Sequence, residues 1–456
     1  MYPAPHEVKA QTGGGAVAGP IGNGEGPLVF GAIADDLTGA LELASLIRRG
    51  GVRCPVLLRP GEGSLGGLEA AVFGLKTRVI PAARAVSAFA QALTALEQRG
   101  VRQVFYKYCA TFDSTPRGNI GPCADLLAER RNAGFTLFSP AFPEVNRTVY
   151  QGHLFAGDIL ILQSPKRFDP LTPMREPNLV KVLQLQTKLP VGLLAHQTLA
   201  QGPAAIAAQI ARLRAQGIRY AIADALDEAD LKATAEVSVD WPLMTGGSSV
   251  AVYYPAIWRE RGWLKGDSLS PDAAPGGGSN ITGGPAVVLA GSCAERTFDQ
   301  LAHFGRQRPV LFLDPARAAE GGLNGSGAAG LVAEALAFAE AGFTEGRPVA
   351  IATSARPEAV ARLQRHLGRR RAARLAEGIL ARIAADLHGT GIRRFVVSGG
   401  ETSGAVLEAL KVEALEVDSY VTAGQSHSVA VGADPISFYL KSGKLGPVEM
   451  LEEVTA

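Results

Sequence analysis

The 456-residue chain lacks several features that would assign it to a broad class at once. No apolar run reaches the roughly 18 residues of a membrane-spanning helix, so no segment is expected to cross a bilayer. Lysine and arginine number 45, aspartate and glutamate 43, and the formal charge is +2. This near-neutral balance argues against nucleic acid or a membrane surface as a partner.

Cysteine is also scarce, with four residues that form no Cys-x-x-Cys pair: Cys54, Cys109, Cys123 and Cys293. This spacing predicts neither a zinc site nor a disulfide framework. The first 27 residues are rich in glycine, proline and alanine and lack the apolar segment of a signal peptide. We expect a flexible tail at 1–27 and a cytoplasmic protein with reduced thiols.

No Walker A sequence occurs, which excludes a P-loop. The run Gly325–Gly330 matches the dinucleotide fingerprint literally, but the preceding strand is expected to end near Asp314. The fingerprint requires a strand directly before it and an acidic residue about 20 positions later. We interpret the run as a glycine-rich loop before a helix at 331–341, which disfavours a nicotinamide-dependent oxidoreductase.

Short apolar runs alternate with helical stretches along most of the chain. The apolar runs of the first half are 28–34, 54–58, 71–76, 103–106 and 135–139. Those of the second half are 286–291, 310–314, 348–352 and 394–398. Strands interleaved with helices of this length predict parallel, doubly wound sheets.

A stretch rich in glycine, proline and serine separates the two alternations, and its composition is typical of a linker. We therefore predict a tail at 1–27, an α/β domain at 28–264, a linker at 265–284 and an α/β domain at 285–456. Both domains are expected to be doubly wound, with mainly parallel sheets. The interdomain cleft is a natural place for a two-substrate reaction.

The most informative polar segment is 107–122, which follows the strand expected at 103–106 and ends in glycine and proline. It brings together an ammonium, a carboxylate, hydroxyls and a carboxamide, from residues that include Lys107, Asp113, Ser114 and Asn119. Ligands of open α/β sheets bind outside the carboxyl ends of the strands. This loop therefore predicts a small, polar, anionic ligand.

Two further polar groups follow strands of the same layer. Asp35 and Asp36 stand at the first strand–helix turn, where adjacent carboxylates are costly unless a cation, a hydroxyl or a helix start uses them. The alternative is that Asp36 or Thr38 only caps the helix. Arg78 lies in a basic turn after another strand, which favours a role beside the two aspartates.

In the second domain, the strand at 394–398 leads directly into Gly399 and Gly400, then Glu401 and Thr402, before a helix expected at 405–410. Glycines let backbone N–H groups approach phosphate, and a helix N-terminus favours negative charge. The alternative is an ordinary tight turn with Thr402 or its neighbour as helix cap.

Two other turns of the second domain are weaker candidates of the same kind. Ser292 lies in the small-residue turn at 291–294, which can face a nucleotide or pack closely. Gly443 lies in the turn at 441–446, which spacing alone would make a surface loop. No set of residues has the spacing of metal ligands, so the metal ligands stay unknown.

Six motifs occur in an order that resembles the four-carbon acid sugar kinases, and the resemblance extends over nearly all of the chain from residue 28. They lie at 34–40, 76–78, 107–122, 146–152, 170–174 and 398–404. The long form Lys-Tyr-Cys-Ala-Thr-Phe-Asp-Ser-Thr, followed later by Arg-Thr-Val-Tyr-Gln-Gly, is similar to the 3-oxo-tetronate kinase branch. Threonate and erythronate kinases carry a shorter version.

The resemblance implies that a sugar acid binds the first domain, that ATP binds the second, and that the C4 hydroxyl of 3-oxo-tetronate is phosphorylated with Mg²⁺. Contacts to the sugar acid would come from Asp35 or Asp36, Arg78, Lys107 and Asp113, with Ser114 and Asn119 in the same loop. Contacts to ATP would come from Ser292, Gly399, Gly400, Glu401, Thr402 and Gly443. Asp35, Asp36 and Asp113 are each candidates for the proton acceptor.

Two alternatives stay open: a kinase for D-threonate or D-erythronate, and a non-catalytic sugar-acid binder with a decayed ATP site. The chain departs from the family's pattern at Ala294, at 424–429 and at 444–445, all on the expected ATP side, and at 163–166. A homodimer is also open.

Overall fold

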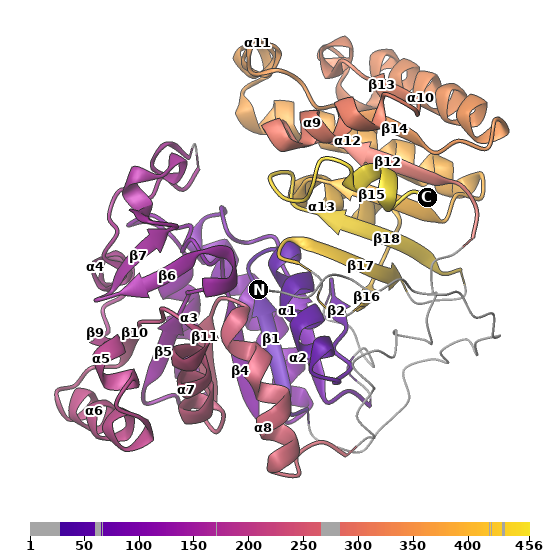
Figure 1. Ribbon diagram of the computed structural model, residues 1–456. Helices are drawn as coiled ribbons and strands as arrows, with labels where there is room; N and C mark the ends of the chain where they lie inside the picture. Colours follow the sequence, from indigo (N-terminus) through magenta and orange to yellow (C-terminus); the bar gives the residue numbers. More distant parts are fainter. Residues whose placement is uncertain are drawn as a thin grey trace.

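A computed structural model describes residues 28–59, 65, 67–169, 171–265, 283–418, 420, 422–430 and 434–456. The expected tail at 1–27 and most of the expected linker, 266–282, lie outside the described residues. Figure 1 shows two lobes, one formed by the first half of the chain and one by the second. Within the described ranges, no helix combines the length and apolarity needed to cross a membrane.

The described strands that the first lobe contributes to the main sheet are all parallel, in the order β2-β3-β1-β4-β11-β5-β10-β9. They are β1 Phe30–Ala34, β2 Val56–Leu57, β3 Ala70–Gly74, β4 Gln103–Lys107, β5 Thr136–Ser139, β9 Val191–Leu194, β10 Tyr220–Ala223 and β11 Leu243–Gly246. The helices between them are α1 Leu37–Arg49, α2 Ala82–Gln98, α3 Ile120–Arg130, α4 Leu179–Gln184, α5 His196–Leu199, α6 Pro203–Ala215, α7 Glu228–Ser238 and α8 Tyr254–Glu260. The expected strands of this half are confirmed as β1 to β5.

The second lobe has parallel strands in the order β13-β14-β12-β15-β18, followed by the antiparallel β17 and then β16. Their bounds are β12 Ala286–Ala290, β13 Val310–Phe312, β14 Val349–Ala352, β15 Arg394–Ser398, β16 Ala414–Val417, β17 Gln425–Ala430 and β18 Ile436–Lys441. The helices are α9 Glu295–Phe304, α10 Ser326–Thr344, α11 Pro357–Leu367, α12 Arg369–Gly389, α13 Gly400–Ala409 and α14 Met450–Glu453. The expected strands β12 to β15 are confirmed.

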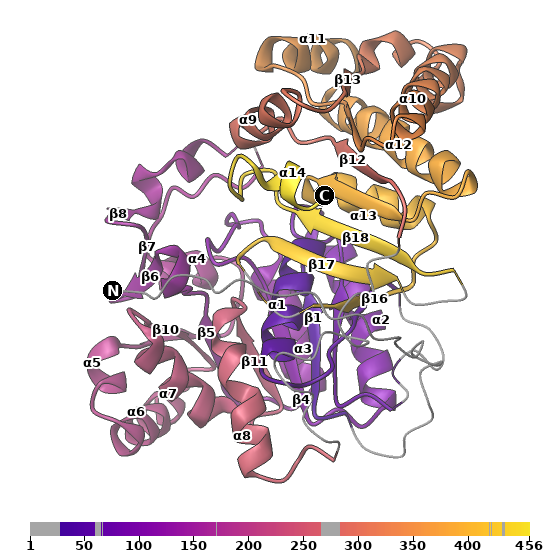
Figure 2. The ribbon, with the colours of Figure 1, turned by 45° about the vertical axis from the view of Figure 1, so that its right-hand side comes forward.

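The two lobes share one sheet, because β16 pairs with β2 in antiparallel fashion. Leu58 N donates to Glu413 O at 2.9 Å just beyond this pair, and Arg53 forms an ion pair with Glu416 at 2.7 Å. In Figures 1 and 2, β16, β17 and β18 lie on the side of the second lobe that faces the first. The mainly parallel, two-domain α/β fold is therefore confirmed, and the strands of the two lobes form one continuous sheet.

Each lobe has a switch point in its strand order. From β1 the chain crosses through α1 to β2, and from the neighbouring β4 it crosses through α3 to β5 in the opposite direction. In the second lobe, the connections that leave the neighbouring strands β12 and β15 also run in opposite directions along the sheet. All such crossover connections have the same hand. When two of them leave neighbouring strands in opposite directions, their helices therefore lie on opposite faces of the sheet, and a crevice opens at the carboxyl ends of the two strands.

Sheet twist explains why the two crevices can face each other. In a flat sheet, β1 and β15 would point in opposite directions, since three antiparallel pairings separate them. Six steps lead from β1 to β15. A twist of roughly 20–25° per step accumulates to on the order of 120–150°, which turns the carboxyl ends toward each other.

A small antiparallel sheet in the first lobe was not predicted. It contains β6 Arg147–Tyr150, β7 His153–Ala156 and β8 Ile159–Leu160, and we call residues 147–169 the flap. The buried carboxylate of Asp224, after β10, accepts hydrogen bonds from Gln151 N at 2.8 Å and Gly152 N at 2.9 Å. These bonds attach the flap to the main sheet.

Three helices begin earlier than the glycines and prolines suggested. α3 begins at Ile120, so the polar loop spans 108–119, and Pro122 lies in a first turn, where a missing N–H does little harm. α13 begins at Gly400 instead of 405. α10 begins at Ser326, so the run Gly325–Gly330 is mostly helical and is not the loop that we expected.

The β2–β16 junction generates a testable expectation for Leu58→Pro. The substitution removes the N–H that Leu58 donates to Glu413 and should lower the free energy of unfolding by about 1–3 kcal/mol more than Leu58→Ala does. Because this bond joins the lobes, calorimetry should also show two separated transitions for Leu58→Pro. Equal stability of the two variants, with one shared transition, would contradict the role of the junction.

Candidate functional site

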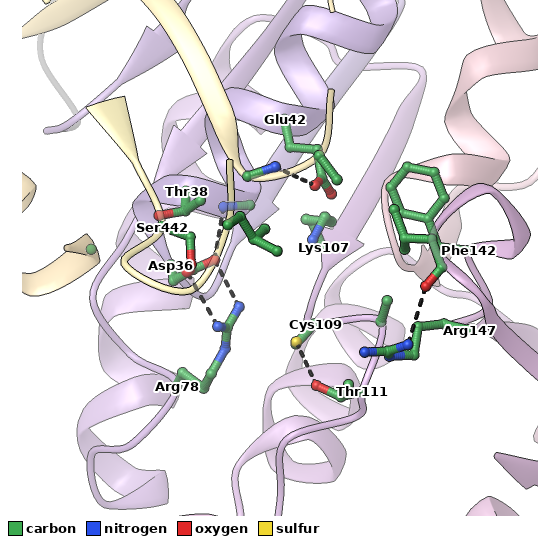
Figure 3. Close-up of a pocket in the computed structure, with 17 residues that line it drawn as sticks. Asp36, Thr38, Glu42, Arg78, Lys107, Cys109, Thr111, Phe142, Arg147 and Ser442 are labelled. Carbon is green, nitrogen blue, oxygen red and sulfur yellow. Dashed lines mark hydrogen bonds and ion pairs between the residues drawn. The ribbon is translucent and has the colours of Figure 1, made fainter. Parts of the chain in front are cut away.

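A cavity of about 400 Å³ lies between the lobes, at the carboxyl ends of their strands. The residues that line it from the first lobe include Asp36, Thr38, Gly39, Glu42, Arg78, Lys107, Cys109, Thr111, Phe142 and Arg147. Those from the second lobe are Gly400, Ala423, Gly424, Ser442 and Leu445. The volume suits a small ligand, and Figure 3 shows how the side chains surround the space.

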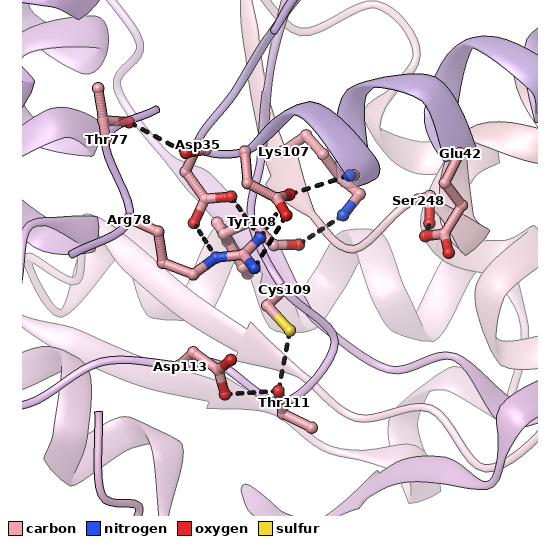
Figure 4. A network of polar contacts seen from close by, with 12 residues as sticks. Asp35, Glu42, Thr77, Arg78, Lys107, Tyr108, Cys109, Thr111, Asp113 and Ser248 are labelled. Carbon is pink, nitrogen blue, oxygen red and sulfur yellow. Dashed lines mark hydrogen bonds and ion pairs between the residues drawn. The ribbon is translucent and has the colours of Figure 1, made fainter. Parts of the chain in front are cut away.

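Arg78 is held between the two aspartates that follow β1, with Asp36 labelled beside it in Figure 3 and Asp35 in Figure 4. Its Nε and Nη2 donate to Asp35 at 3.0 and 2.7 Å, and its Nη1 and Nη2 donate to Asp36 at 3.2 and 2.7 Å. Four of the five N–H groups of a guanidinium are thereby used. Arg78 is therefore engaged by the protein itself.

The charges of this cluster compensate one another. Burial raises the pKa of the Asp35 carboxyl, and the adjacent Arg78 acts in the opposite direction. Burial also disfavours the charge on Arg78, but Asp35 and Asp36 outweigh it and raise the pKa of Arg78. The bidentate hydrogen bonds from Arg78 favour the ionised form of Asp35 and oppose the effect of burial, and Arg78 fixes both carboxylates in place.

Asp36 also caps α1, since its Oδ1 accepts a hydrogen bond from Gly39 N at 2.9 Å. The buried Lys107, at the end of β4, donates from Nζ to Tyr108 O at 2.9 Å. A Cβ at Gly39 would lie 2.6 Å from Asp36 Oδ1 and 2.8 Å from Lys107 Nζ. Glycine is thus required for the close approach of Lys107 and Asp36 over the first turn of α1.

Asp113, Ser114 and Asn119 do not line the cavity, although they belong to the same loop. Asp113 Oδ1 accepts from Thr111 Oγ1 at 2.6 Å and pairs with Lys166 of the flap at 2.8 Å. Ser114 accepts from Gln186 at 2.9 Å. Asn119 Nδ2 donates to Thr77 O at 2.6 Å and Ile80 O at 3.2 Å, which supports the turn that carries Arg78.

The residues predicted to contact ATP cluster at the second switch point. Gly399 has a φ of 119°, which favours glycine, and is the N-cap of α13. A Cβ there would lie 3.2 Å from Thr402 Oγ1 and 3.4 Å from Ser292 Cβ. Gly443 packs so closely on Ser292 that a Cβ at this position would overlap its hydroxyl. Glu401 is exposed in the first turn of α13.

Lys441 is a buried cation beneath this cluster. Its Nζ donates to Ser398 Oγ at 3.1 Å, and it forms no ion pair within the described residues. Burial and the nearby Arg296 lower the pKa of Lys441 to about 8. A buried ammonium without a counter-charge is costly, which points to an anion that binds close by.

The two clusters meet at the first turns of α1 and α13. A Cβ on Gly400 would lie 3.4 Å from Thr38 Oγ1, and both residues line the cavity. Helix N-termini favour negative charge, and here two of them face one small space. The arrangement can hold an anionic group between the lobes.

Sequence reasoning missed the roles of Glu42 and Arg147, which both line the cavity. Glu42, on α1, accepts hydrogen bonds from Ser248 Oγ and, at 3.3 Å, from Gly424 N of the other lobe. Glu42 lies within a helix, where a charged side chain is ordinary, so the sequence offers no reason to single it out. Arg147 belongs to the quoted 146–152 motif, but its entry into the cavity depends on the unpredicted flap.

Comparison with known proteins agrees with this division of the chain. Residues 30–254 match a family model described as a sugar-binding N-terminal domain. Residues 287–451 match a model described as a nucleotide-binding C-terminal domain. The two matches fall on the two lobes.

Several curated relatives are named 3-oxo-tetronate kinase. The one from Burkholderia multivorans is 42% identical, over 93% of this chain and 96% of its own length. Those from Cupriavidus necator and Salmonella typhimurium are 43% and 37% identical, over 93% and 92% of this chain and 96% of each relative.

Two solved structures share the fold over 93% of this chain and 98% of theirs. One, from Salmonella typhimurium LT2 and described as a tRNA synthase, has a TM-score of 0.80 and 35% identity. The other, from Haemophilus influenzae, has a TM-score of 0.72 and 33% identity. By both family models and by relatives aligned over almost its whole length, this chain belongs to the four-carbon acid sugar kinase family.

Proposed function

We propose that this protein transfers a phosphoryl group from ATP to the C4 hydroxyl of 3-oxo-tetronate in the cavity between the lobes. The observation that carries the proposal is the close approach of α13 to α1 beside Asp36, where a Cβ on Gly400 would lie 3.4 Å from Thr38 Oγ1. Two helix N-termini of separate lobes face one space there. Phosphoryl transfer depends mostly on positioning and on electrostatic stabilisation, which this arrangement offers.

The side chains at the cavity would have distinct roles in the transfer. Asp36, which lines the cavity, would orient the C4 hydroxyl and accept its proton. Asp35 and Arg78 would hold the Asp36 carboxylate in place. Lys107 and the N–H groups of both first turns would stabilise the charge on the transferred group.

Among the three aspartates that the sequence left open, the geometry supports Asp36 as the proton acceptor. Asp35 is buried against Arg78, and Asp113 pairs with Lys166 outside the cavity lining. Ser114 and Asn119 would shape the loop without touching the substrate.

Mg²⁺ fits this site as an ion that ATP carries. The described residues contain no group of three or more His, Cys, Asp or Glu side chains that could hold a metal, and Mg²⁺ commonly uses phosphates, waters and one or two carboxylates. Asp36 and Glu42 are the carboxylates that line the cavity. When bound, Mg²⁺ would offset phosphate charge.

The names of the relatives favour 3-oxo-tetronate over D-threonate or D-erythronate. Residues at the departures on the ATP side form local hydrogen bonds or lie at the surface. Ala294 donates its N–H to Ser292 Oγ at 3.2 Å, Gly424 reaches Glu42, and Lys444 is exposed. These contacts support an intact nucleotide site. A cytoplasmic location, a homodimer and the predicted domain boundaries stay predictions.

The substrate proposal is tested by an assay of ADP release with 3-oxo-tetronate, D-threonate and D-erythronate. We expect the highest kcat/KM for 3-oxo-tetronate. An equal or higher value for D-threonate would overturn the choice of substrate. Thermal stabilisation by the sugar acids, with none by ATP and Mg²⁺, would instead indicate a non-catalytic binder.

Replacement of single carboxylates tests the assignment of the proton acceptor. Asp36→Asn should lower kcat by roughly 10²–10⁴-fold, while the helix cap survives because asparagine caps helices equally well. Asp113→Asn removes an ion pair outside the cavity and should act mainly on stability. A larger loss of kcat for Asp113→Asn than for Asp36→Asn would reverse the assignment.

Lys441 generates an expectation for the pH dependence of stability. Its pKa is about 8 in the folded protein and about 10.4 in an unfolded chain, so the unfolded state binds more protons between these values. The contribution of Lys441 to the free energy of unfolding is therefore least favourable below pH 8, and it becomes more favourable as the pH rises toward 10.4. Lys441→Met should stabilise the protein at pH 7 and lose that advantage by pH 10, as measured by urea unfolding.

Lys444→Met is the matched control, since Lys444 is exposed on the same turn. It should change neither stability nor its pH dependence. If Lys441 supports the nucleotide phosphates, Lys441→Met should also raise the KM for ATP. A variant whose stability advantage is the same at pH 7 and pH 10 would contradict the low pKa.

A further inference from the structure

The cavity contains three basic side chains, and their partners divide them into two kinds. Arg78 is neutralised by Asp35 and Asp36 and has a single N–H left. Lys107 and Arg147 bind only backbone carbonyl groups within the described part of the chain. Positive charge that is not engaged in an ion pair among the described residues is therefore available at Lys107 and Arg147.

Arg147, the first residue of the flap, is held in a particular orientation by the turn that precedes it. Its backbone pairs with Phe142, with N···O distances of 3.1 and 2.7 Å. Its Nη1 donates to Val145 O at 3.1 Å and to Asn146 O at 3.0 Å. Both N–H groups of Nη1 are thus occupied, while Nε and Nη2 have no partner among the described residues.

The free edge of this guanidinium matches a carboxylate. Nε and Nη2 present parallel N–H groups, the geometry in which arginine binds two carboxylate oxygens at once. Because Nη1 is already fixed to the backbone, little side-chain freedom would be lost when a ligand binds. Arg78 cannot offer such a pair, since it has only one N–H to give.

Arg147 also lies on the appropriate side of the cavity. Figure 3 shows it opposite Asp36 and Thr38, with Lys107 and Cys109 between the two sides. Burial raises the pKa of the Cys109 thiol, which is therefore neutral and would not repel an anion. Asp113, which accepts a hydrogen bond from Thr111 behind this side, is compensated by Lys166.

We propose that Arg147 forms the subsite for the substrate's carboxylate, so that C1 lies at the flap and C4 lies at Asp36. The proposal rests on the proposed function, because it assigns the two ends of that substrate. Arg78, which the resemblance placed among the contacts to the sugar acid, is not needed for this role. Arg78 then acts by positioning Asp35 and Asp36.

The test compares 3-oxo-tetronate with erythrulose, the neutral ketose in which CH₂OH replaces the carboxylate. Arg147→Met should lower kcat/KM for 3-oxo-tetronate by about 10- to 100-fold, and should leave that for erythrulose within about 3-fold. Arg147→Lys keeps the positive charge but loses the pair of parallel N–H groups. Its kcat/KM for 3-oxo-tetronate should lie between those of wild type and Arg147→Met. Equal losses on both compounds, or none on either, would overturn the proposal.

Arg167→Met is the matched control, because Arg167 lies on the same flap, is exposed and stacks over Phe168 outside the cavity. It should leave both kcat/KM values unchanged. An equal shift in selectivity for Arg167→Met would show a general effect of flap charge and would also overturn the proposal.

A binding measurement separates this proposal from failure of the proposed function. If wild type releases no ADP with any sugar acid, calorimetric titration with D-threonate still reports the carboxylate subsite. Binding that weakens about 10-fold or more in Arg147→Met, but not in Arg167→Met, supports the subsite without catalysis. Unchanged affinity in Arg147→Met, or no binding by wild type, overturns it.

Discussion

The antiparallel pairing of β2 with β16 is the constraint on which the rest of the molecule depends. It joins two parallel α/β lobes into one sheet, and the twist of that sheet turns both sets of strand ends toward a common space. Without it, the aspartates after β1 and the glycines after β15 would belong to separate crevices. α1 strengthens the connection, because Glu42 on its cavity side binds Gly424 of the second lobe.

Within the common space, charge compensation decides which groups are free to act. Arg78 donates hydrogen bonds to two carboxylates and thereby makes the Asp36 side of the cavity rigid. Among the described residues, Lys107 and Arg147 form no ion pair, and Lys441 is buried in the other lobe without one. A sugar acid bound together with the phosphates of ATP matches this pattern better than a neutral ligand.

Much of the fold and part of the site could be predicted from the sequence. Apolar runs located β1 to β5 and β12 to β15, because strands buried on both faces are continuously apolar. The shared sheet could not be predicted, since β2 is only two residues long and pairs with β16, more than 350 positions away. Residue types at the strand ends predicted roles for Asp36, Arg78 and Lys107, which all line the cavity. They could not show that Arg78 uses four of its five N–H groups on two carboxylates, or that Asp113 pairs with Lys166.

The most direct test of the central claim is a crystal structure with 3-oxo-tetronate, Mg²⁺ and a non-hydrolysable ATP analogue. We predict the γ-phosphate between the first turns of α1 and α13, next to Thr38 and Gly400. The C4 hydroxyl should lie within hydrogen-bond distance of Asp36. A sugar acid bound with its carboxylate at Asp36, or a γ-phosphate outside the cavity between the lobes, would contradict this assignment.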